Sequence, residues 1–163
     1  MRGPDGEVVR ASYVLTDATV DIGGRMVAQD ARKGIVLSRI GGPLRQVARV
    51  EGLYPQDTWS GPTVTYTRLG CRGGSVVVSL QSDPSLFTKP TRVVASVRGR
   101  KVGRVTVAPT AMRLLTVPLQ PLGSTCTATF RVSPTLTPAV VTKGQNPDTR
   151  RLGIHFTRFT YRP

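Results

Sequence analysis

The stretch DTRRLGIHFTRFTYRP, residues Asp148–Pro163, is the part of this chain that best decides its fold. After a polar turn, apolar residues stand at every second position, which is the period of a half-buried β-strand (Leu152, Ile154 and Phe156). The pattern then slips by one residue, and Phe159 and Tyr161 continue it. A one-residue slip turns side chains to the other face of a sheet, so we expect a β-bulge or bend near Thr157–Arg158. The stretch predicts a closing strand that holds the C-terminus in a sheet.

The composition of the whole chain is that of an all-β protein. Its 163 residues suit one domain with a core large enough to fold unaided. Glycine and proline are frequent, at 17 and 13, which favours many short strands joined by turns. No apolar run approaches the roughly 20 residues that a membrane helix needs. We therefore expect a single domain over residues 1–163, with residues 1–33 as its least certain part.

Short apolar or alternating runs recur along the chain at the spacing of an antiparallel sandwich. Before the closing strand they are Val8–Leu15, Gly34–Ile40, Leu44–Val50, Thr63–Arg68, Ser75–Gln81, Arg92–Val97, Arg104–Val107, Leu114–Leu119 and Thr125–Val132. The segment Arg98–Lys101 predicts a tight hairpin turn with Gly99 at positive φ. The best helical segment is a single turn at Asp83–Phe87. About ten short strands predict an all-β, antiparallel, jelly-roll-like β-sandwich.

The two cysteines bear on the compartment of the protein. Cys126 is in phase with Ala128 and Phe130 and should point into the core, while Cys71 precedes a turn. In a sandwich their strands can face one another, which makes a disulfide the favoured prediction and two buried thiols the alternative. A disulfide would indicate an oxidising, extracytoplasmic setting. With no CxxC motif and His155 as the only histidine, neither a metal site nor a cofactor is predicted.

The net charge of +14 predicts attraction to anionic partners. The 23 basic residues, mostly arginine, are spread along the whole chain. Nonspecific attraction to anionic lipid head groups, teichoic-type polymers or nucleic acid follows at low salt. A dedicated nucleic-acid site is disfavoured, because the local basic clusters lack interleaved aromatic residues.

Signals of catalysis are weak. His155 lies between Ile154 and Phe156 in the closing strand, where a structural role is expected. There is no GxSxG elbow, and the nine acidic residues form no acid/base pair motif. The chain is not expected to be an enzyme by itself.

The loop GLYPQDTWSGP, residues Gly52–Pro62, is the most distinctive polar and aromatic segment. Aromatic rings beside a carboxylate are how many β-sandwiches bind sugars, because a ring stacks on the sugar face while polar groups bind its hydroxyls. The candidate carbohydrate-binding residues are Tyr54, Asp57, Trp59 and Tyr66. In the alternative interpretation, Trp59 and Tyr54 close the end of the sandwich.

Four segments occur in an order that resembles a known family: residues 34–62, Cys71–Phe87, Cys126–Pro138 and the closing Asp148–Pro163. Together they resemble the soluble, extracytoplasmic β-sandwich domain attached to actinobacterial membrane-bound cell-envelope glycosyltransferases of the lipid-linked mannosyl- or arabinosyl-transferring kind. The resemblance implies a jelly-roll-like fold, a cell-envelope location, and a role in holding acceptor glycan or packing on the membrane enzyme. It carries over no catalytic residue, because the family's catalytic carboxylate belongs to the membrane portion. The family tends to place Asp directly before Gly-Trp, whereas this chain has Asp57-Thr58-Trp59.

Two functions of different classes follow from the sequence. The first is a non-catalytic accessory or carbohydrate-binding domain, whose partner is a cell-envelope glycan or a membrane-bound glycosyltransferase. The alternative is a basic structural or nucleic-acid-binding β-protein that uses its net positive charge.

Overall fold

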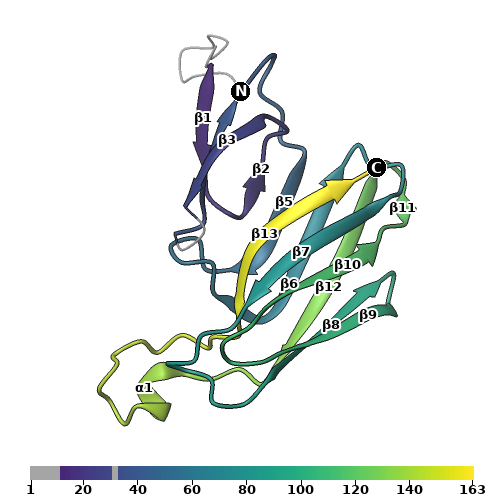
Figure 1. The fold of residues 1–163 in the computed structure, drawn as a ribbon. Coiled ribbons are helices and arrows are strands. Elements are labelled where there is room, and N and C mark those ends of the chain that lie inside the picture. Colours follow the sequence, from purple (N-terminus) through teal and green to yellow (C-terminus); the bar gives the residue numbers. More distant parts are fainter. Residues whose placement is uncertain (1–11, 31–32) are drawn as a thin grey trace.

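A computed structural model describes residues 12–30 and 33–163 and shows three antiparallel sheets (Figure 1). The first sheet contains β1 (Tyr13–Thr16), β4 (Ile35–Arg39) and β3 (Arg25–Asp30), in that order. The second contains β10 (Met112–Pro118), β7 (Ser75–Gln81) and β13 (His155–Arg162). The third runs β2 (Val20–Asp21), β5 (Ala48–Leu53), β6 (Ser60–Leu69), β12 (Thr125–Ser133), β8 (Thr91–Val97) and β9 (Arg100–Val107), and β11 (Pro121–Leu122) also pairs with β12.

The second and third sheets enclose one hydrophobic core, as the sequence predicted for an all-β sandwich. Inward-facing residues alternate with exposed ones along β12 and β8, as expected for strands with one buried face. Phe130 of β12 meets Phe156 of β13 edge to face, with ring centroids 5.7 Å apart. The described residues form 13 strands rather than about ten, because the short strands β2, β3 and β11 carry no clear periodic pattern.

Strand β13 contains the predicted bulge. Phe156 pairs with Leu80 and Phe159 with Val78, and the register shifts between Phe156 and Arg158. Leu80 and Val78 both belong to the core. The extra residue therefore returns both phenylalanines to the inner face, where their rings stack with centroids 5.8 Å apart.

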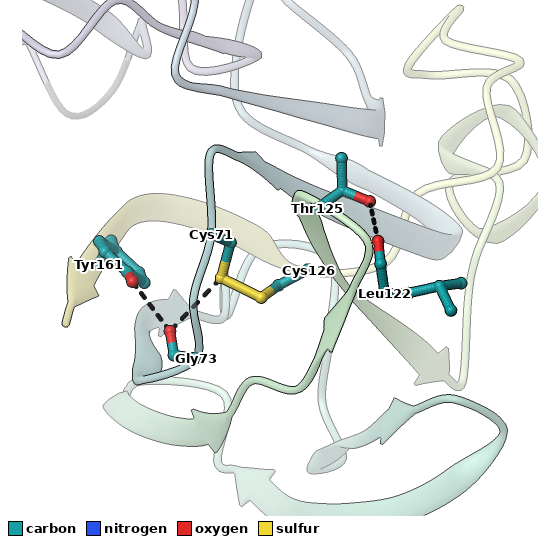
Figure 2. The surroundings of a disulfide bond; sticks show 6 residues. All are labelled: Cys71, Gly73, Leu122, Thr125, Cys126 and Tyr161. Atoms are coloured by element: carbon teal, nitrogen blue, oxygen red, sulfur yellow. Dashed lines mark hydrogen bonds between the residues drawn. A yellow bond between two sulfur atoms is a disulfide. The ribbon is translucent and has the colours of Figure 1, made fainter.

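The predicted disulfide joins Cys71, in the loop after β6, to Cys126 of β12 (Figure 2). Their Cα atoms lie 5.6 Å apart, and both side chains are buried. The Tyr161 hydroxyl donates a hydrogen bond to the Gly73 carbonyl oxygen at 2.8 Å, so the end of β13 is fixed to the same loop. The pairing excludes the alternative of two free thiols, and a disulfide is typical of proteins from oxidising compartments.

Across residues 12–30 and 33–163, no helix is long and apolar enough to cross a membrane.

Several sequence predictions need adjustment in detail. Of Val8–Leu15, residues 8–11 lie outside the described part, and β1 begins at Tyr13. The segment Asp83–Phe87 forms a turn in which the Phe87 N–H donates to the Asp83 carbonyl oxygen at 2.9 Å. The single short helix of the described residues is α1 (Pro138–Val141), which the sequence pattern did not reveal. The hairpin turn is confirmed, with Gly99 at φ 76°.

Candidate functional site

The loop that follows β5 folds back on the segment before β13. Within the loop, the Tyr54 N–H donates to the Trp59 carbonyl oxygen at 2.8 Å. The Ser60 N–H donates to the Ile154 carbonyl oxygen at 3.0 Å, and the Gly153 N–H donates to that of Ser60 at 2.7 Å. This backbone pairing brings three predicted site residues, Tyr54, Asp57 and Trp59, next to residues 148–155.

Trp59 is part of a small hydrophobic cluster rather than an open platform. Its side chain is 9 % exposed and packs with Phe87 and Leu152. The His155 ring lies over the indole with centroids 3.9 Å apart, and the Phe87 ring lies 6.1 Å away. This geometry favours the interpretation in which Trp59 closes the end of the sandwich, because little of the indole is free for a sugar.

His155 is held by the same loop. Its Nδ1 lies 3.0 Å from both the Asp57 carbonyl oxygen and the Thr58 hydroxyl oxygen. A carbonyl oxygen only accepts, so Nδ1 carries the proton in this arrangement. Burial lowers the pKa of His155, and its hydrogen bond to Asp57 partly opposes that shift. A neutral, packed imidazole fits the structural role expected from the sequence.

Arg150 forms an ion pair with the carboxylate of Asp57. Its Nη2 lies 2.7 Å from both Asp57 Oδ2 and Asp148 Oδ2. The guanidinium also lies over the Tyr54 ring, 4.7 Å from its centroid. These hydrogen bonds raise the pKa of Arg150, and the hydrogen bond from Arg150 lowers the pKa of Asp148. These ion pairs therefore connect the loop after β5 to the segment before β13, and they leave the carboxylates of Asp57 and Asp148 paired with Arg150.

Tyr66 lies apart from the other three predicted residues. It stands on β6, seven residues after Trp59, which corresponds to about 23 Å along a strand. Its ring is 2 % exposed and stacks on Phe159 of β13, with centroids 5.4 Å apart and planes 5° from parallel. The four residues therefore do not form one site.

A cavity of about 400 Å³ lies where the first sheet meets the edge of the sandwich. One wall comes from the segment between β1 and β3 and from the strands of the first sheet (Thr16, Asp17, Ala18, Val20, Asp21, Ile22, Gly23, Gly24, Met26, Gln29, Val36 and Ser38). The other wall comes from β5, β6 and β13 (Ala48, Val50, Tyr66, Arg68 and residues 157–161). Its volume is within the range of small-ligand sites, about 300–1,000 Å³.

Arg68 contributes a charged group to this cavity. Its guanidinium lies over the Tyr161 ring, 4.5 Å from the centroid, and its Nη1 is 3.4 Å from Asp21 Oδ2. The Arg68 side chain is 19 % exposed and that of Asp21 is 51 % exposed. Both therefore retain donors or acceptors that a polar ligand can reach.

Tyr66 and Gln29 complete the polar part of the cavity. Burial raises the pKa of Tyr66 to about 12, although the neighbouring Arg68 acts against the shift. The Tyr66 hydroxyl is consequently neutral near pH 7. The Gln29 side chain donates to the Thr157 carbonyl oxygen at 2.9 Å and so connects the first sheet to the bulge of β13.

No sequence pattern predicts this cavity. Its walls come from segments that are far apart in the chain, and β3 carries no alternating pattern. The sequence predicts a binding role for Tyr66, but none for Arg68, Asp21 or Tyr161. In the part of the chain that the structure describes, no three His, Cys, Asp or Glu side chains gather as a metal ion would require.

No protein-family model and no curated protein sequence matches this chain. Among solved structures, the chain is similar to an acetyl xylan esterase from the rumen bacterium Butyrivibrio proteoclasticus, with a TM-score of 0.32 and 14 % sequence identity. The similarity covers 93 % of this chain and 33 % of the esterase chain, so the match spans about one third of that protein.

Proposed function

We propose that this protein is a non-catalytic, glycan-binding accessory domain of an extracytoplasmic cell-envelope glycosyltransferase system, and that the cavity beside Tyr66 holds the glycan. The observation that carries the proposal is the combination of aromatic and hydroxyl-binding groups in one cavity of suitable size. Sugar sites need both, because pyranose and furanose rings present apolar C–H faces as well as hydroxyls.

The cavity offers these two kinds of surface side by side. Phe159 and Tyr161, which are only partly buried, supply aromatic carbon on the sandwich side, and the buried Tyr66 lies behind them. Arg68, Asp21 and Gln29 supply charged and amide groups around them. The tyrosine hydroxyl is neutral near pH 7 and can donate to a sugar oxygen.

Two further observations support the envelope setting. The Cys71–Cys126 disulfide favours an oxidising compartment. The order of the four sequence segments resembles domains attached to mannosyl- or arabinosyl-transferring membrane enzymes, for which an acceptor glycan is the natural ligand. The catalytic step would then belong to that membrane enzyme.

The proposal is tested by calorimetric titration of the oxidised domain with linear mannose and arabinose oligosaccharides. We expect binding to one series, and a loss of affinity of at least about tenfold in Arg68→Met, because one hydrogen bond to a charged group contributes about 1.5–3 kcal/mol. Tyr66→Phe, which keeps the stacked ring, should weaken binding by a smaller factor.

Two variants serve as controls. Arg49→Met removes an exposed charge from the outer face of β5, and Trp59→Phe changes the hydrophobic cluster at the end of the sandwich. Both should bind like the parent. Absence of binding to either oligosaccharide series, or equal affinity of Arg68→Met and the parent, would overturn the proposal.

A further inference from the structure

The outer face of the third sheet is rich in threonine and basic residues. Side chains on this face alternate with the buried core residues along each strand. Its hydroxyl-bearing residues on β6, β12, β8 and β9 include Thr63, Thr65, Thr67, Thr127, Thr129, Ser96 and Thr106. Its basic residues on the same strands are Arg92, Lys101, Arg104 and Arg131. We call these eleven residues the Thr/Arg face.

The strand register aligns the basic residues in rows across the sheet. Arg131 of β12 pairs with Val94 of β8, and Val94 pairs with Arg104 of β9. Arg131 and Arg104 are therefore two strand spacings apart, about 10 Å between Cα atoms. In the neighbouring row, Thr129 and Lys101 flank Ser96 in the same way.

Among the described residues, the basic side chains of this face lack acidic partners. None of its four basic side chains makes an ion pair within residues 12–30 and 33–163. On the neighbouring strand β5, the exposed carboxylate of Glu51 pairs with Arg49 at 3.4 Å. The hairpin between β8 and β9 adds exposed Arg98 and Arg100 beside the face.

We propose that the Thr/Arg face binds an extended, phosphodiester-linked polyol polymer. Guanidinium and ammonium groups bind phosphates, while the threonine hydroxyls bind both phosphate and polyol oxygens. The Thr/Arg face contains no aromatic side chain on which a base could stack, so a nucleic-acid strand would lose its main sequence-independent contact there. The face lies on the outside of the third sheet, and this inference does not depend on the glycan cavity.

The test measures binding of fluorescently labelled poly(glycerol phosphate) by anisotropy, at low and high salt. A single-stranded DNA with the same number of phosphates serves as the comparison. We expect the polymer to bind more tightly than the DNA, with an affinity that falls as salt rises. Arg104→Glu/Arg131→Glu should lose at least about tenfold in affinity, because each reversal replaces an attraction by a repulsion.

The matched control is Arg72→Glu/Arg113→Glu, which has the same net charge but changes the loop after β6 and strand β10 of the opposite sheet. It should bind within about twofold of the parent, since exposed charges away from the contact are screened. If reversal unfolds the domain, Arg104→Gln/Arg131→Gln provides the same comparison with a smaller loss. Equal losses in the face and control variants, or tighter binding of the DNA, would overturn the proposal.

Discussion

At the scale of single residues, the two aromatic clusters have different roles. Trp59, Phe87 and His155 fill the end of the sandwich, where rings and backbone leave little exposed surface. Tyr66 and Phe159 stack at the opposite part of β6, where one edge of the core meets a cavity. Sequence alone placed Tyr66 with Trp59 because both are aromatic residues near one loop. The distance between the two rings, and the residues that cover each of them, are set by the strand pairing, which the sequence alone does not reveal.

The buried imidazole of His155 should make stability depend on pH. Burial lowers its pKa in the folded state, so the unfolded chain takes up a proton first as the pH falls below about 6.5. The contribution of His155 to the free energy of unfolding is therefore fully present above about pH 6.5, and it is lost as the pH falls through the pKa of the folded state. Urea unfolding of the parent at about pH 7.5 and about pH 5.5 should show lower stability at the acidic value.

His155→Gln removes this titration while keeping a polar side chain at the position. Its stability should change less than that of the parent over the same pH interval. An equal change in both proteins would show that other groups account for the acid sensitivity.

At the scale of elements, the closing strand was the most predictable part of the chain. Its phase slip indicated a bulge, because both Phe156 and Phe159 had to reach the core from one strand. The hairpin at Gly99 and the pairing of the cysteines were also predicted, since each depends on local chemistry or core phase. Helix α1 and strand β3 were not, because a single helical turn and an exposed strand leave no periodic pattern.

Deletion of Thr157 tests the bulge of β13 directly. Thr157 is the extra residue of the bulge, so its removal would leave Phe156 opposite Leu80 and Phe159 opposite Val78 in an uninterrupted register, with both rings still on the inner face. We expect this variant to keep its fold and to lose mainly the hydrogen bond from Gln29 to the Thr157 carbonyl oxygen, about 0.5–1.5 kcal/mol in the free energy of unfolding. Deletion of Thr160 would instead turn Tyr161 to the outer face and break its hydrogen bond to Gly73, so it should lower the free energy of unfolding further. Equal losses for the two deletions in urea unfolding would contradict the assigned register.

At the scale of the whole molecule, the disulfide-linked sandwich has two separate candidate binding surfaces. The cavity lies against the first sheet, and the Thr/Arg face lies on the outside of the third. The net charge of +14 did not by itself locate either surface, because basic residues are spread through the sequence. The sheet register gathers four of them on one face and directs Arg68 to the other.

The disulfide should contribute strongly to global stability. Cys71 and Cys126 are separated by 55 positions, and closing a loop of that length contributes roughly 4 kcal/mol in the chain-entropy model. Cys71→Ala/Cys126→Ala should therefore unfold at much lower urea, and reduction should bring the parent close to that variant. Unfolding midpoints that stay equal with and without reductant would contradict a stabilising bond.

The location of the glycan site is tested most directly by nuclear magnetic resonance of the nitrogen-labelled domain during titration with a mannose or arabinose oligosaccharide. We predict that the amide signals of Tyr66, Arg68, Phe159 and Tyr161 shift together with increasing ligand, while those around Trp59 stay in place. Shifts confined to the Trp59 loop would contradict the assigned site, and an absence of shifts with both sugars would contradict glycan binding.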